Sequence, residues 1–177
     1  MKKKIVVTGA SKGIGKAIAL YFGAQGFDVA ICARDAKKLE AVAAELRATG
    51  ALVISSVCDV TNQQQILQFA AEVEKQWGCI DVLVNNAGIQ HVSAIEDFPE
   101  EKWNAIIAIN LTSAFHLTKA VWKGMKERKF GRIINIASAH GLVASEFKSA
   151  YIASKHGIVG FTKTMALEGA PFNITAN

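Results

Sequence analysis

Three polar residues near the carboxyl end of the chain, Ser138, Tyr151 and Lys155, have types and a spacing suited to proton transfer. Tyr151 and Lys155 are four positions apart, so a helix would place them one turn apart on one face. A phenol titrates near ~10 in water, and a neighbouring ammonium favours its ionised form. Tyr151 could therefore act as a general base towards an alcohol or a general acid towards a ketone, with Ser138 bonded to the same oxygen. The alternative is an ordinary pair of side chains on a helix surface.

Apolar and amphipathic stretches alternate along the chain, and this pattern predicts the elements that position those side chains. The apolar stretches predict strands at residues 4–8, 27–33, 51–57, 80–84 and 132–137, with a further strand beginning at Ile174. Helices are expected up to about Gln25, from 36 to about 49 behind an Asp35 cap, to about 77 behind Thr61 or Asn62, and over 99–109, 111 to about 129 and 149 to about 169. Continuous apolar strands between helices indicate an α/β fold, a Rossmann-like doubly wound parallel sheet with helices on both faces.

A glycine-rich loop, Gly9-x-x-x-Gly13-x-Gly15, lies between the first predicted strand and the first helix. Glycines let the backbone approach a pyrophosphate, and the N-terminus of the following helix offers free N–H groups and a positive dipole end. The spacing differs from the G-x-G-x-x-G fingerprint, and a tight strand–helix turn is the alternative. Its position after the first strand favours the cofactor interpretation, so we expect residues 1–177 to form a single dinucleotide-binding domain.

Polar residues at the ends of the second and third predicted strands bear on the identity of the dinucleotide. An acidic residue after the second strand would bind the ribose 2′-hydroxyl of NAD, whereas a basic residue suits the 2′-phosphate of NADP. Arg34 stands at that point and Lys12 lies in the glycine loop, so both favour NADP(H), unless Arg34 is simply solvated. Asp59, which ends the third strand, could accept a hydrogen bond from an adenine amino group or could cap its own loop.

The stretch Asn85-Asn86-Ala87-Gly88 ends the fourth strand, where small and amide residues could line a cofactor or form a plain turn. Asn110 interrupts the following helical stretch, so it is interpreted as a helix cap or as a polar anchor for a water molecule. Gln90, His140 and Lys148 all follow strand ends, on the side where such sheets bind ligands. Together they could hold a small anion, although each alone could be a surface residue.

Composition excludes some classes of function. The 177 residues carry a net charge of only +5, and the basic stretches Lys2–Lys4 and Lys123–Arg132 have no interleaved aromatic residues, so a nucleic-acid site is not expected. Cys32, Cys58 and Cys79 have no metal or redox spacing, and the histidines show no ligand pattern, so no metal site is proposed. We expect neither a signal peptide nor a membrane span, and a cytoplasmic location.

The glycine loop, the Asn85–Gly88 stretch, Asn110, Ser138 and the Y-x-x-x-K pair in this order resemble the short-chain dehydrogenase/reductase family over the whole chain. That resemblance implies that Tyr151 is the acid/base, that Lys155 binds the nicotinamide ribose and favours ionised tyrosine, that Ser138 orients the substrate oxygen and that Asn110 holds a water in a proton relay. The implied cofactor-binding residues are Gly9, Ser11, Lys12, Gly13, Ile14, Gly15, Arg34, Asp59, Val60, Asn86, Ala87, Gly88, Tyr151 and Lys155.

From Asn85 onward the sequence looks like the bacterial 3-hydroxybutyrate dehydrogenase subfamily, in NNAGIQHV, EKWNAIIAINL, GRIINIASAHGLV and K-S-A-Y. This likeness implies a short hydroxy or keto acid as substrate, bound through Gln90, Ser138, His140, Lys148 and Tyr151. The subfamily uses NAD, whereas the first half of the chain looks like NADPH-dependent reductases, so an NADPH-dependent 3-oxoacyl reductase is the alternative.

The family continues beyond the point corresponding to Asn177, with a substrate lid and a last strand, and forms homo-oligomers, in this subfamily homotetramers. We therefore expect an enzyme acting on small molecules, with neither nucleic acid nor membrane as partner. The alternative of another class is a truncated, non-catalytic dinucleotide-binding or interaction fragment.

Overall fold

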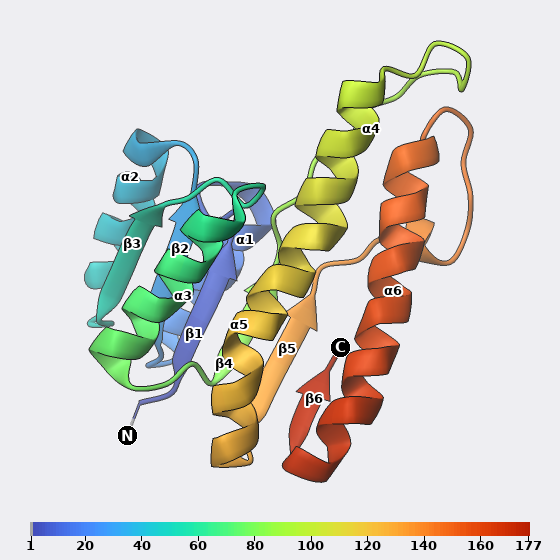
Figure 1. Ribbon diagram of the computed structural model, residues 1–177. Coiled ribbons are helices and arrows are strands. Elements are labelled where there is room, and N and C mark those ends of the chain that lie inside the picture. Colours follow the sequence, from blue (N-terminus) through green and yellow to red (C-terminus); the bar gives the residue numbers. More distant parts are fainter. Residues whose placement is uncertain (1) are drawn as a thin grey trace.

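The computed structural model describes residues 2–177, which form a parallel six-stranded sheet with helices on both faces (Figure 1). The strand order is β3-β2-β1-β4-β5-β6, and every neighbouring pair is parallel. The strands are β1 (Lys4–Thr8), β2 (Asp28–Ala33), β3 (Val53–Val57), β4 (Val82–Asn85), β5 (Gly131–Asn135) and β6 (Ile174–Ala176). The strand order changes direction between β1 and β4, and sheets of this kind bind ligands at that point. The predicted α/β class is confirmed.

Two helices cover one face of the sheet and the remaining helices cover the other (Figure 1). On the first face lie α1 (Gly13–Ala24) and α2 (Ala36–Arg47). On the second lie α3 (Gln63–Trp77), the run from α4 (Glu100–Ile107) through η1 (Ala108–Thr112) to α5 (Ser113–Arg128), and α6 (Ser149–Gly169). Two short 3₁₀ turns also occur: η2 (Ala139–Gly141) lies between β5 and α6, and η3 (Ala170–Phe172) lies between α6 and β6. The core strands are buried on both faces, which explains their uniformly apolar sequences.

Side-chain caps begin two of the helices where the sequence predicts them. The Asp35 carboxylate accepts a hydrogen bond from the backbone N–H of Lys38 at 3.0 Å, and the Asn62 amide oxygen accepts from Gln64 and Gln65. Both predicted caps are confirmed, with Asn62 rather than Thr61 in the capping role. The left-handed Gly78 ends α3.

The helical stretch around Asn110 differs from its prediction. The sequence predicts two helices separated at Asn110, but one continuous helical run extends from Glu100 to Arg128. Within it, η1 is a π-helical turn that contains Asn110, so this residue is not a helix cap. A π turn inserts a wider loop into an α-helix without ending it and frequently occurs at functional sites.

The same helical run bears on the expectation that the chain has no membrane span. By length and composition alone, Glu100–Arg128 could cross a membrane. Its side chains Leu117, Val121 and Met125 are instead fully buried in the core beneath the sheet, together with residues of α3. This burial accounts for the apolar composition of the run, because a core helix needs the same residue types as a membrane span.

Candidate active site

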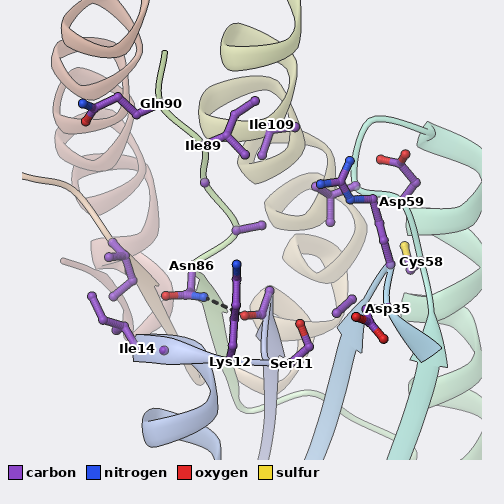
Figure 2. Close-up of a pocket in the computed structure, with 18 of the residues that line it drawn as sticks. Ser11, Lys12, Ile14, Asp35, Cys58, Asp59, Asn86, Ile89, Gln90 and Ile109 are labelled. Carbon is purple, nitrogen blue, oxygen red and sulfur yellow. Dashed lines mark hydrogen bonds between the residues drawn. The ribbon is translucent and has the colours of Figure 1, made fainter. Parts of the chain in front are cut away.

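A cleft of about 680 Å³ opens at the carboxyl ends of β1, β2, β3, β4 and β5. Most of the residues that the sequence singles out for a cofactor lie in its wall (Figure 2). In Figure 2, Ser11, Lys12, Asp35 and Asp59 line one end, and Gln90 lies across the cleft from them. The lining residues are Gly9, Ser11, Lys12, Gly13, Ile14, Ala33, Arg34, Asp35, Lys38, Cys58, Asp59, Val60, Asn86, Ala87, Gly88, Ile89, Gln90, Ile109, Ile136, Ala137, Tyr151 and Lys155.

The glycine loop brings backbone, rather than side chains, to the floor of the cleft. Gly9 and Gly13 have left-handed φ angles of 63° and 56°, which glycine adopts without strain. A Cβ on Gly9 would lie 2.9 Å from the Cα of Ala87, so this loop and the loop after β4 touch directly. Helix α1 begins at Gly13 with no side-chain cap and no acidic residue in its first turn. Its free N–H groups and dipole can therefore receive an anionic group.

Gly15 lies beneath the cleft rather than in its wall. A Cβ on this residue would lie 2.6 Å from the carbonyl oxygen of Gly9 and would overlap the Asn86 side-chain amide. That amide donates hydrogen bonds to the carbonyl oxygens of Thr8 (2.8 Å) and Gly9 (3.3 Å), and the second of these is drawn in Figure 2. Gly15 and Asn86 therefore fix the glycine loop to the loop after β4.

The β2–β3 end of the cleft carries two carboxylates that are hydrogen-bonded to the protein and two cations that form no salt bridge with the described residues. Asp35 pairs with Lys38 at 2.9 Å, and hydrogen bonds from the Lys38 backbone and side chain lower the pKa of that carboxyl. Asp59 accepts from the backbone N–H and hydroxyl of Thr61, both at 2.9 Å, and the backbone bond is the main reason that its pKa is lowered. Within residues 2–177, neither Lys12 nor Arg34 forms a salt bridge. Arg34 also lowers the pKa of Asp59 through its charge without forming a salt bridge with it. This end of the cleft therefore carries three cations, Lys12, Arg34 and Lys38, against the two carboxylates Asp35 and Asp59.

The Asn110 side chain is buried in the π turn and is hydrogen-bonded to two other segments of the chain. Its side-chain oxygen accepts from the backbone N–H of Ile89 at 2.8 Å, and its amide donates to the Ile89 carbonyl at 2.9 Å and to the Ser154 hydroxyl at 3.2 Å. Both amide hydrogens are thereby used by protein partners. Any water-holding role for this residue therefore falls to its backbone or to the remaining lone pair of its side-chain oxygen.

Helix α6 carries Tyr151 and Lys155 on the face towards the cleft. Lys155 is only 5 % exposed, and its ammonium donates a 2.6 Å hydrogen bond to the carbonyl oxygen of Ile136, just beyond β5. The same ammonium lies 5.6 Å from the centre of the Tyr151 ring. Burial lowers the pKa of Lys155 because the charged form loses solvation. The predicted pairing of these two side chains at one point of the cleft is thus present in the fold.

Ser138 lies in the turn that follows β5. Its hydroxyl oxygen accepts a hydrogen bond from the backbone N–H of His140 at 3.2 Å and so begins η2. This turn packs tightly on α6, because a Cβ on Gly141 would lie 2.9 Å from the carbonyl oxygen of Lys155. Ser138 is not among the residues that line the cleft, but its turn is held directly against the helix that bears the tyrosine and lysine.

Two of the three predicted anion-binding residues meet, and the third lies on another loop. The Lys148 ammonium is 3.3 Å from Nε2 of His140, whose ring contacts the Tyr151 ring edge-to-face at 6.1 Å between centroids. Nδ1 of His140 is buried without a hydrogen-bond partner among the described residues. Gln90 is exposed at the far end of the cleft wall. His140 and Lys148 therefore form one polar group beside Tyr151.

Several lining residues were not predicted from the sequence. Cys58 lies next to Asp59, and Ile89, Ile109 and Ile136 supply an apolar wall next to the lysine and tyrosine. The general signal for all of them is their place at a strand's carboxyl end, apart from Ile109, which the π turn brings into the wall. Among residues 2–177, no group of three or more His, Cys, Asp or Glu side chains could hold a metal ion.

Comparison with known proteins gives concordant matches. The family model described as short chain dehydrogenase matches residues 3–177. A D-beta-hydroxybutyrate dehydrogenase of Cupriavidus necator is 51% identical over 178 residues, which cover 99% of this chain and 68% of that protein. Among solved structures, an actinorhodin polyketide ketoreductase with NADPH has a TM-score of 0.96 at 42% identity, and an NAD+-bound xylitol dehydrogenase has 0.95 at 37%. Each alignment covers 99% of this chain and 68% of the other.

Proposed function

The chain belongs to the short-chain dehydrogenase family of oxidoreductases acting on CH–OH groups, and from this premise we propose that it interconverts a small 3-hydroxy acid and the 3-keto acid. The reaction moves a hydride between the substrate carbon and C4 of a nicotinamide dinucleotide. The observation that carries this proposal is the buried Lys155 beside Tyr151, at the wall of a cleft floored by a glycine loop.

The cleft suits a nicotinamide dinucleotide in shape and in charge. The left-handed Gly9 and Gly13 and the uncapped N-terminus of α1 would receive the pyrophosphate. The free cations Lys12 and Arg34 would hold a 2′-phosphate, whereas Asp35 is already engaged by Lys38. On these grounds we favour NADP(H) over NAD(H). When bound, the dinucleotide supplies the hydride acceptor or donor.

The proton is assigned to Tyr151. In oxidation it removes the hydroxyl proton of the substrate, and in reduction it returns a proton to the ketone oxygen. The Lys155 ammonium lies 5.6 Å from the centre of the Tyr151 ring, and it would bind the nicotinamide ribose when the dinucleotide is present. Ser138 is proposed to donate a hydrogen bond to the same substrate oxygen. These groups orient the substrate carbon for hydride transfer, which is the main contribution of a preformed site.

The acid group of the substrate is assigned to His140 and Lys148. The two side chains are 3.3 Å apart, and the His140 ring contacts the Tyr151 ring. A carboxylate bound to them would therefore be separated from the reacting oxygen by only a few substrate carbons. An ammonium and an imidazole are ordinary partners of a carboxylate. Gln90, on the other wall, would add an amide. The 51% identity with a D-beta-hydroxybutyrate dehydrogenase supports the same substrate class.

Replacing Tyr151 with phenylalanine tests the chemistry. The chain has two tyrosines, and Tyr21 is 62% exposed on α1, away from the cleft lining. Tyr151→Phe should bind NADPH within about twofold of the parent but lose turnover of 3-hydroxybutyrate by at least about a hundredfold, whereas Tyr21→Phe should retain it. A Tyr151→Phe variant with parental turnover would refute the assignment. Binding of dinucleotide without turnover by the parent would favour a non-catalytic binding role.

A 3-oxoacyl reductase is the second candidate function. Two observations favour it: the free cations Lys12 and Arg34, and the close match to a polyketide ketoreductase solved with NADPH. Reduction of a 3-oxoacyl thioester and of acetoacetate should be compared at equal NADPH. Because a 3-oxoacyl thioester carries a thioester in place of the carboxylate, Lys148→Ala should reduce kcat/KM for acetoacetate selectively if the acid is the substrate. Equal losses on both substrates would favour the reductase.

A further inference from the structure

The hydroxyl of Ser154 lies between two residues of the candidate active site. This side chain is completely buried, one position before Lys155. Its hydroxyl donates a 2.7 Å hydrogen bond to the backbone carbonyl of Tyr151 and accepts a 3.2 Å bond from the Asn110 amide. A serine bonded to a carbonyl of the preceding turn is common in helices. The additional bond from Asn110 is what distinguishes Ser154 from such a residue.

Through that bond, Ser154 connects three separate segments of the chain. Asn110 already holds the backbone N–H and carbonyl of Ile89, in the loop after β4. Ser154 extends this connection to the first turns of α6. Among the hydrogen bonds of residues 2–177, it is the link between the Asn110 side chain and the helix that carries Tyr151 and Lys155. The cleft wall at Ile89 is therefore tied to the reacting residues through two buried side chains.

Packing next to this link leaves little freedom for the helix. One turn further along α6, a Cβ on Gly157 would lie 2.8 Å from the side chain of Leu111, so α6 and the π turn are in close contact. On the other side, the Lys155 ammonium is held by the Ile136 carbonyl at 2.6 Å. A shift of α6 relative to the π turn would break the bond from the Asn110 amide to Ser154, whereas the bond from Ser154 to the Tyr151 carbonyl moves with the helix that contains both residues.

We infer that Ser154 is a positioning residue: it fixes the first turns of α6 against Asn110 and Ile89 and thereby sets where Tyr151 and Lys155 meet the substrate. This inference rests on the proposed oxidoreductase function. Ser154 touches neither substrate nor dinucleotide and acts through its neighbours. Loss of its hydroxyl would leave one amide hydrogen of Asn110 without its partner in a buried place.

The test compares Ser154→Ala with a matched control, Ser113→Ala. Ser113 is also buried and donates a 2.7 Å hydrogen bond to a carbonyl one turn earlier, that of Ile109. A displaced acid/base residue costs turnover rather than dinucleotide affinity, so Ser154→Ala should lower kcat about tenfold or more. Its NADPH Kd should stay within about twofold, and its kcat–pH midpoint for alcohol oxidation should move to higher pH. Ser113→Ala should keep both kcat and the midpoint.

A double-mutant cycle with Asn110→Ala identifies the route of the effect. If Ser154 acts through Asn110, the double variant should lose no more turnover than Asn110→Ala alone. Equal losses of kcat in Ser154→Ala and Ser113→Ala, an unchanged pH midpoint, or multiplicative losses in the double variant would each overturn the inference.

Hydrogen exchange separates this inference from the proposed function. Ser154→Ala should speed amide exchange in the peptides covering 86–90 and 149–157, whereas Ser113→Ala should not. If the parent enzyme turns over none of the offered substrates, the proposed function fails, but faster exchange in both peptides would still establish the link. Unchanged exchange in those peptides would refute the positioning role whatever the activity.

Discussion

The two ends of the cleft are built in different ways. At the β2–β3 end, the wall includes the exposed cations Lys12 and Arg34, which form no salt bridge within the described part of the chain. At the other end, Asn110, Ser154 and Lys155 are buried, and each is hydrogen-bonded to the protein. The first arrangement leaves charge free to meet a ligand. The second holds the proposed reacting groups in one geometry, so substitutions there should affect turnover and stability together.

The sharpest test of the buried end is Asn110→Ala. It removes the partner of the Ile89 backbone groups and of the Ser154 hydroxyl. Because each buried polar group left without a partner costs about 1–3 kcal/mol, the free energy of unfolding should fall by about 3 kcal/mol, with loss of turnover. Urea unfolding measures the first effect. Asn104 is an exposed residue of α4, so Asn104→Ala should change neither the free energy of unfolding nor turnover. Parental stability in Asn110→Ala would remove the contrast between the two ends.

The next test asks whether the other end depends on backbone contacts. In Gly15→Ala, the new Cβ would meet the Gly9 carbonyl and the Asn86 amide, so we expect a loss of about 2 kcal/mol in unfolding free energy, with weaker dinucleotide binding. Gly160→Ala is the matched control, since a Cβ there has no atom within 4 Å and helical alanine is favoured over glycine. Equal stability of the two variants would show that the close approach at Gly15 is dispensable.

A smaller effect is expected from removing the exposed cation Arg34 at the β2–β3 end of the cleft. Arg34→Ala should raise the Kd for NADPH about tenfold, which corresponds to about 1.4 kcal/mol, and change that for NADH by less than about twofold. Its urea unfolding should remain within about 0.5 kcal/mol of the parent, because Arg34 has no buried contact to lose. Lys37→Ala, an exposed neighbour outside the cleft lining, is the control for net charge. Equal weakening of both dinucleotides would argue against a 2′-phosphate at Arg34.

The smallest effect concerns the pH dependence of stability at Lys155. Its folded-state pKa lies below the ordinary value of 10.5, so between these two values the unfolded chain binds more protons and stability rises with pH. Below the folded-state pKa the lysine is charged in both states and carries the cost of burial. Relative to Lys155→Met, the parent should therefore gain stability as pH rises towards 10.5. The exposed Lys163→Met should show no such trend in urea titrations at several pH values, and a flat difference for Lys155 would contradict the prediction.

Elements with strong local signals were predictable. The Asp35 and Asn62 caps, the glycine loop and the order of strands and helices all depend on residues adjacent in the sequence. The helical run around Asn110 was not, because the asparagine is stabilised inside the helix by Ile89 and Ser154, which lie 21 and 44 positions away. The same distance explains why Ser154 gave no signal: its local sequence is that of any helix residue.

The sequence by itself determined the class of fold. It also indicated the candidate chemistry, because residues four positions apart on a helix, such as Tyr151 and Lys155, lie on the same face. The tertiary structure alone decided which atoms those residues meet. The Ile136 carbonyl reaches Lys155 only because β5 ends beside α6, and the Lys148 ammonium meets His140 only because the turn after β5 folds back on that helix. Local propensity sets the elements, but burial and hydrogen bonding between distant segments set the geometry of the site.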